Sequence, residues 1–277
     1  MSHTVLATPL GDVALHRLGT PATGAPRTPV LLLHANPGDS RDYGAVAAGL
    51  AAEREVFALD WPGYGRSTVT APHSVTPEGL ADVAERALDA IAREGAAPRV
   101  HVVGSSVGGW VAVRLAERRP AQVAGIVLVD PAGFTRLTPL TRWFCRAVMG
   151  RPSRAGRLVA PLARAYLGRL RTSSARATYE RARGVGADAG RLAVHCALWR
   201  AFAAPGFGLT GVLPGIVPPV LLLWGRRDPL LPALTDGRRA RRSLPPGATY
   251  ATLPAAHEAY NERPDLFLAR VRPFLTD

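Results

Sequence analysis

Short apolar runs alternate with amphipathic segments along most of the chain, and this alternation constrains the fold more than any other feature. A run that is apolar on both faces is typical of a strand buried on both sides in a parallel sheet covered by helices. We therefore predict an α/β fold with a mostly parallel, twisted sheet of eight strands flanked by helices. The expected strands cover residues 4–6, 13–16, 30–34, 55–60, 99–104, 126–130, 220–225 and 249–253.

Helical periodicity is clearest in two segments, residues 77–93 and 107–118, and a closing helix is expected at 265–274. Between the sixth and seventh strands the alternation stops, and residues 155–171 and 190–202 show a helical pattern instead. The sequence thus predicts a core domain made of residues 1–133 and 213–277. Residues 134–212 are predicted to form a helical lid inserted after the sixth strand.

The predicted lid carries most of the charge of the chain, whose 34 basic and 21 acidic residues leave a net charge of +13. All the basic residues are arginines, and residues 134–212 hold fourteen of them against Glu180 and Asp188, a local net charge of +12. One interpretation is that these arginines only reflect the arginine-rich composition of the chain and lie on a solvent-exposed face without a partner. The other is an acidic partner, which would be an anionic substrate, an acyl-carrier protein or a membrane surface. Arg157, Arg164 and Arg171 would share one face of a continuous helix.

Several classes of protein are not indicated. No apolar run reaches the ~20 residues that span a bilayer, and the start lacks the pattern of a signal peptide. With only Cys145 and Cys196, no disulfide framework is expected, so we predict a cytoplasmic protein with reduced thiols. No phosphate loop, dinucleotide fingerprint, metal-ligand spacing or nucleic-acid motif occurs. We expect no cofactor, no metal and no nucleic-acid partner.

The strongest chemical signal is Gly104-Ser105-Ser106-Val107-Gly108, a G-x-S-x-G between a predicted strand and a predicted helix. A strand-to-helix turn this tight requires glycines, because side chains flanking the serine would clash. The turn raises the Ser106 hydroxyl above the sheet and directs the helix N-terminus at the reacting oxygen. Ser106 is therefore the predicted nucleophile.

A serine nucleophile needs a base, and among the seven histidines His257 has the best position. It directly follows the last predicted strand, at the carboxyl edge where active sites of open α/β sheets lie. His101 and His195 fall in a buried strand and in the insertion, where structural histidines are expected. His257 is the predicted general base.

Two aspartates compete for the role of orienting His257. Asp228 follows strand 220–225. Nucleophile, acid and base in the order Ser106, Asp228, His257 follow the order expected with a G-x-S-x-G turn between a strand and a helix. Asp130 ends strand 126–130 and is the alternative. We favour Asp228, because its loop can reach a histidine on the next loop, and expect Asp130 to organise the entrance to the insertion.

Five segments in this order resemble the α/β-hydrolase superfamily, in the branch of esterases, carbon–carbon bond hydrolases, cofactor-free haloperoxidases and haloalkane dehalogenases. They are Leu31-Leu32-Leu33-His34-Ala35-Asn36-Pro37-Gly38, Asp60-Trp61-Pro62-Gly63-Tyr64-Gly65-Arg66-Ser67, Val103-Gly104-Ser105-Ser106-Val107-Gly108-Gly109, Leu223-Trp224-Gly225-Arg226-Arg227-Asp228, and His257 with Glu262-Arg263-Pro264. The resemblance covers the chain outside the insertion.

The resemblance implies an oxyanion hole formed by the backbone N–H groups of Asn36 and Val107. The family usually has a His-Gly pair at the positions of His34 and Ala35, so Ala35 departs from that pattern. Dehalogenase and epoxide-hydrolase activities are disfavoured, because those branches use an aspartate nucleophile where this chain has Ser106.

The predicted function is hydrolysis of an ester, thioester or carbon–carbon bond beside a carbonyl in a small-molecule substrate. The alternatives are an acyltransferase or cyclase acting on a carrier-bound substrate and a non-catalytic ligand-binding homologue. Candidate substrate-contacting residues are His34, Trp143, Phe144 and Trp199.

Overall fold

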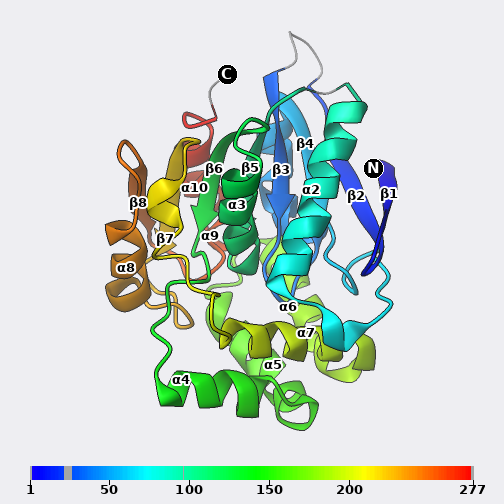
Figure 1. The fold of residues 1–277 in the computed structure, drawn as a ribbon, viewed down its shortest axis with the longest axis vertical. Helices are drawn as coiled ribbons and strands as arrows, with labels where there is room; N and C mark the ends of the chain where they lie inside the picture. Colours follow the sequence, from blue (N-terminus) through cyan, green and yellow to red (C-terminus); the bar gives the residue numbers. More distant parts are fainter. Residues whose placement is uncertain (1, 22–26, 96, 276–277) are drawn as a thin grey trace.

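One eight-stranded sheet forms the centre of the molecule (Figure 1). The computed structural model describes residues 2–21, 27–95 and 97–275. Its strands follow the order β1-β2-β4-β3-β5-β6-β7-β8, and all eight predicted strands are confirmed. Their bounds are β1 Ser2–Thr8, β2 Gly11–Gly19, β3 Arg27–Leu33, β4 Arg54–Leu59, β5 Val100–Ser105, β6 Val123–Val129, β7 Val220–Gly225 and β8 Thr249–Leu253.

The strands from β4 to β8 run parallel, whereas β1 and β2 form an antiparallel hairpin at one edge. Every residue of β5 and β7 is buried, as are residues 29–33 of β3, because helices cover both faces of the sheet. In contrast, β1 lies at the edge and is mostly exposed. The wholly apolar runs are thus the inner strands, as their composition predicts.

Two sets of helices cover the sheet. Side chains of α2 and α3 share one hydrophobic cluster with one face of the sheet, and side chains of α1, α9 and α10 share another with the opposite face. Helix α2 begins as expected, with the Thr76 hydroxyl accepting from the Gly79 N–H and Pro77 in the first turn. None of the described helices combines the length and apolar character needed to cross a membrane. The bounds are α1 Ala47–Ala51, α2 Pro77–Arg93, α3 Val107–Arg118, α8 Arg238–Arg242, α9 Ala259–Glu262 and α10 Pro264–Val271.

The interval between β6 and β7 is helical, and its helices gather at one end of the sheet (Figure 1). It contains α4 Pro139–Trp143, the π-helical segment η3 Phe144–Met149, α5 Pro152–Tyr166, α6 Ser173–Gly184 and α7 Ala189–Phe202. Several of its buried residues, such as Val159 and Leu198, belong to the same hydrophobic cluster as α2 and α3. That residues 134–212 act as a lid stays a prediction; below they are called the insertion.

One expectation for the insertion is wrong. Helix α5 ends at Tyr166, so Arg171 lies beyond it and cannot share a helical face with Arg157 and Arg164. The Leu167 N–H still donates to the Ala163 carbonyl, and Gly168 then adopts a φ of 64°, which stops the helix. The seven-residue spacing of the arginines continues in the sequence beyond Gly168, but the helix does not, and so the spacing does not place Arg171 on the same face.

The inner strands should dominate stability. Leu32 in β3 is fully buried, whereas Leu234 is 81% exposed. We expect Leu32→Ala to lower the free energy of unfolding by ~2–5 kcal/mol, because it leaves a cavity in a closely packed core. The matched variant Leu234→Ala should change it by less than ~0.5 kcal/mol. Equilibrium urea unfolding measures both, and equal effects would contradict the described packing.

Candidate active site

Ser106 lies in a turn that only small neighbours allow. It connects β5 to α3 with a φ of 54°, a left-handed conformation that is rare outside glycine. A Cβ on Gly108 would lie 2.1 Å from the Leu33 carbonyl oxygen, and one on Gly104 would lie 2.2 Å from the Gly108 oxygen. Both positions therefore require glycine. The strained serine is held by its N–H, which donates to the Val129 oxygen at 3.0 Å.

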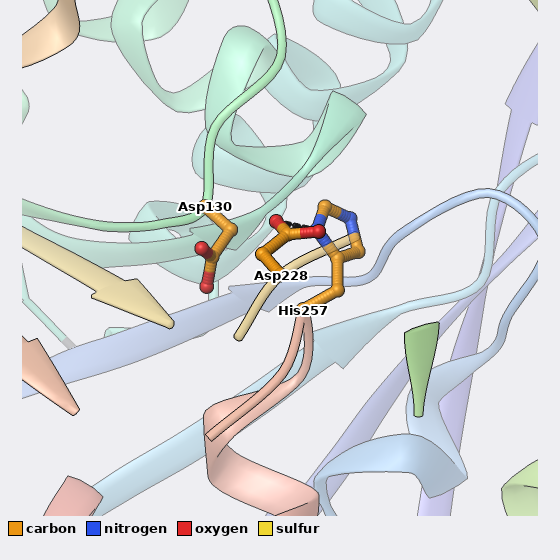
Figure 2. Close-up of side chains that lie close together, drawn as sticks. All are labelled: Asp130, Asp228 and His257. Carbon is orange, nitrogen blue, oxygen red and sulfur yellow. Dashed lines mark hydrogen bonds and ion pairs between the residues drawn. The ribbon is translucent and has the colours of Figure 1, made fainter. Parts of the chain in front are cut away.

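His257 and Asp228 form a buried hydrogen-bonded pair (Figure 2). The Nδ1 atom of His257 lies 2.6 Å from Oδ2 of Asp228. The other carboxylate oxygen of Asp228 accepts from the backbone N–H groups of Leu230 and Leu231, at 2.8 and 3.0 Å. The His257 N–H itself donates to the Tyr166 carbonyl in the insertion at 3.0 Å. Both partners are thus fixed in orientation by backbone groups.

Asp130 lies beside this pair but makes a different contact. Figure 2 shows its carboxyl group next to Asp228, with the dashed line joining only Asp228 and His257. Its Oδ1 accepts from the Gly225 N–H at 2.8 Å, which ties the end of β6 to the end of β7. Burial, reinforced by the neighbouring Asp228 carboxylate, raises the pKa of Asp130 well above its usual range. The negative charge of the two carboxyls therefore resides on Asp228.

The electrostatics around His257 favour a basic imidazole. Burial disfavours the imidazolium, but the Asp228 carboxylate outweighs this effect, so the pKa of His257 is raised above its usual value. Next to it, Glu258 is buried and lies close to Asp42, and these two effects raise the pKa of Glu258 to about 8. The charged form of Glu258 is thus disfavoured, and when it does ionise, its charge adds to the effect of Asp228 on the pKa of His257.

A cavity of about 290 Å³ brings Ser106, His257 and Asn36 together. Asn36 is held by its side-chain oxygen, which accepts from the Tyr64 hydroxyl at 2.8 Å. Val107 begins α3, and the first N–H groups of a helix have no acceptor within that helix. A substrate carbonyl in this cavity would therefore meet a nucleophile, a base and a helix N-terminus.

Of the four residues predicted to contact the substrate, two line the cavity and two do not. Phe144 and Trp199 line it, and their rings meet edge to face at 5.8 Å between centroids. His34 is fully buried beneath the loop, where its Nε2 accepts from the Trp61 N–H at 3.0 Å. Trp143 is 55% exposed. Neither His34 nor Trp143 is among the described lining residues of this cavity, since His34 is part of the loop's hydrogen bonding and Trp143 lies at the surface, so their contact with the substrate stays a prediction.

Other lining residues escaped the sequence analysis. Leu230 and Leu231 come two and three residues after Asp228, a proximity that could have identified them. Phe202 and Leu162 come from different helices of the insertion, and no local pattern distinguishes them from core residues. Phe207, also in the wall, is held by Trp110, whose indole N–H donates to its carbonyl at 2.8 Å.

Asp130, Asp228 and His257 are also the one group of described residues whose ligand atoms lie close enough, within 4.8 Å, to hold a metal ion. Three of the four carboxylate oxygens already accept hydrogen bonds, and Nδ1 of His257 is engaged with Asp228. This donor set fits the orientation of an imidazole better than metal ligation.

Comparison with known proteins agrees with this architecture. The family model of the alpha/beta hydrolase fold matches residues 28–264. The chain is 39% identical over 103 residues to the lipase LipV of Mycobacterium tuberculosis, an alignment covering 37% of each protein. The alignments with the curated relatives cover 25% to 37% of the length of those proteins.

Solved structures match over nearly the whole chain. A thermophilic esterase from Thermogutta terrifontis is 26% identical, with a TM-score of 0.75 over 99% of this chain and 98% of the other. The enol-lactonase from Burkholderia xenovorans LB400 is 21% identical, with a TM-score of 0.78 over 99% of this chain and all of the other, and shows the fold alone. The chain belongs to the alpha/beta hydrolase fold family.

Proposed function

We propose that this protein is a serine hydrolase in which Ser106, His257 and Asp228 form the catalytic triad. The observation that carries the proposal is that Ser106 and His257 line one cavity while Asp228 binds the far side of the imidazole at 2.6 Å. A hydrogen bond to Nδ1 selects the tautomer in which Nε2 is free to accept a proton. That is the arrangement a serine nucleophile needs.

The reaction follows from these positions. Ser106 Oγ attacks the carbonyl carbon of the substrate while His257 accepts the hydroxyl proton. The N–H groups of Asn36 and Val107 stabilise the oxyanion of the tetrahedral intermediate. The imidazolium then protonates the leaving group, and water, activated in the same way, releases the acid and restores Ser106.

The cavity favours an uncharged, apolar substrate. Its wall is made mainly of aliphatic and aromatic side chains, no Asp, Glu or Arg is among its described lining residues, and His257 is the only basic residue there. Burying an unpaired carboxylate or phosphate there would be costly. The arginines of the insertion do not line this cavity, so an anionic substrate finds no cation in it. We infer that the substrate is an ester whose acyl group is uncharged and apolar.

Cavity size limits that acyl group. At ~30 Å³ for each small group, about 290 Å³ holds roughly ten non-hydrogen atoms, which fits an acyl group of about six to eight carbons. Ester chemistry is further supported by the similarity to the Mycobacterium tuberculosis lipase and the Thermogutta terrifontis esterase.

Removing the nucleophile should abolish activity. We expect Ser106→Ala to lower kcat for a p-nitrophenyl ester by at least ~10³-fold without changing the melting temperature, because the activated hydroxyl is lost. A fluorophosphonate probe should label the native protein at Ser106. The adjacent Ser105→Ala variant is the control and should remain labelled. Labelling that survives in Ser106→Ala would exclude Ser106 as the nucleophile.

Replacing the two aspartates should have opposite consequences. Asp228→Asn should lower kcat by roughly 10⁴-fold, because the amide favours the wrong tautomer. Asp130→Asn replaces a neutral acid by a neutral amide, so it should alter kcat far less and act mainly on stability.

The pH dependence of kcat/KM provides an independent readout. His257 must be neutral to act as a base, so activity should fall as the pH drops through its pKa, which lies above ~6.5. Asp228→Asn should move this acidic limb to lower pH, because the carboxylate that raises the pKa is removed. Asp130→Asn should leave the limb in place. A limb that moves in Asp130→Asn instead would make Asp130 the ionised partner.

Acyl-chain preference should follow the cavity. Across p-nitrophenyl esters from acetate to palmitate, kcat/KM should be highest at about six to eight acyl carbons. Leu162→Trp should shift this optimum to shorter chains, because the larger ring fills space in the cavity. Leu158→Trp, one turn earlier in α5, is the matched control and should keep the native preference. An unchanged optimum in Leu162→Trp would contradict this placement of the acyl group.

A further inference from the structure

The first helical turns of the insertion expose two large apolar side chains. Leu140 is 72% exposed and Trp143 is 55% exposed, both in α4. Residues three positions apart lie on the same side of a helix, so the two side chains form one exposed patch. Figure 1 shows α4 at the edge of the molecule farthest from the sheet, beyond α5 and α7 in that view. The patch is therefore free to meet another surface.

The same helical run also borders the active-site cavity. Thr141 of α4 and Phe144 and Cys145 of η3 are lining residues, and Leu137, just before α4, is another. Residues 137–145 thus separate the cavity from the surface that carries Leu140 and Trp143. A partner bound at the patch would lie directly next to the substrate cavity.

The surroundings of the patch are positively charged. Residues 131–179 contain no aspartate or glutamate and ten arginines: Arg136, Arg142, Arg146, Arg151, Arg154, Arg157, Arg164, Arg169, Arg171 and Arg176. The four nearest in sequence to the patch that are exposed are Arg136, Arg146, Arg151 and Arg154. Arg142 and Arg146 both donate to the Ala203 carbonyl, at 3.3 Å, so their charge is not neutralised by that contact.

We propose that the patch, Leu140 and Trp143 with the arginines around α4, binds the surface of an anionic lipid bilayer. Exposed tryptophan and leucine side chains beside cations are typical of a surface that binds such a bilayer. The two apolar side chains insert into the interface, and the guanidinium groups contact the anionic headgroups. A second copy of this chain is disfavoured as the partner, because it would bring an equally basic surface against the first.

Bilayer binding at α4 also explains the arginines of the insertion, which do not line the cavity and so have no role in binding the substrate there. The cavity is apolar, so its substrate partitions into lipid, while the positive charge attracts the protein to the anionic surface from which that substrate is drawn. The inference does not depend on the catalytic mechanism, since vesicle binding can be measured without turnover.

Flotation with vesicles tests the proposal. The protein is mixed at low ionic strength with vesicles of phosphatidylglycerol and phosphatidylcholine, or of phosphatidylcholine alone. We expect binding to the anionic vesicles at least about tenfold stronger than to the neutral ones, falling as salt is added. The double variant Leu140→Ser/Trp143→Ser should lose at least about tenfold in affinity for the anionic vesicles.

Matched variants and a spectroscopic signal control the experiment. Val217→Ser/Leu234→Ser removes two side chains that are 83% and 81% exposed outside the insertion, and it should bind like the native protein. Arg136→Gln/Arg151→Gln should weaken binding and its salt dependence. Tryptophan emission should shift to the blue when anionic vesicles are added, and Trp143→Phe should lose most of that shift.

Three results would overturn the proposal. The first is no binding to anionic vesicles at low ionic strength. The second is binding that the Leu140→Ser/Trp143→Ser variant retains in full. The third is retention on an immobilised acidic carrier protein with no binding to vesicles, which would assign the patch to a protein partner instead.

Discussion

The close approach of α3 to β3 is the constraint on which the site depends. Gly108 lies so near the Leu33 carbonyl that a methyl group would overlap it, and Gly104 is equally confined by Gly108. This contact packs the first turn of α3 against the sheet and forces Ser106 into a left-handed conformation. The strain is sustained because residues 29–33 of β3 and all of β5 are buried, and the two strands are hydrogen-bonded to each other. The serine, the helix N-terminus and the loop after β3 are then brought to one edge.

A division of charge between two neighbouring carboxyls sets the chemistry at that edge. Asp130 and Asp228 lie at the ends of adjacent parallel strands, so their proximity follows from the sheet. Two ionised carboxylates cannot share such a buried place without a large cost. Asp228 has two backbone N–H donors and the imidazole to stabilise its charge, whereas Asp130 accepts from the single N–H of Gly225. The number of donors decides which acid orients His257.

The arginines of the insertion stabilise its helices more than they shape the cavity. Arg154 donates to the Ala147 carbonyl at 2.7 Å, Arg164 to Gly168 at 2.8 Å and Arg200 to Gly150 at 2.7 Å. Each of these carbonyls lies near a helix end, where the last carbonyl groups have no N–H partner within the helix. Arg181 instead pairs with Asp39 and Asp42 and joins α6 to the loop after β3. The cavity wall therefore stays apolar although the insertion is strongly basic, and the remaining charge faces solvent.

Local pattern alone determined the eight strands, the bounds of α2 and α3, and the identity of Ser106 and His257 as candidates, because each depends on periodicity or on a turn that few residues can form. The tertiary structure decided what depends on contacts between distant segments. Asp130 and Asp228 both follow strands, and only the donors around each distinguish them. His34 and Trp143 lie close in sequence to residues of the site, yet backbone packing buries one and the orientation of α4 exposes the other. The cavity wall joins Leu162, Phe202 and Leu230 from segments with no shared pattern, since a pocket is formed by how helices pack and not by any one of them.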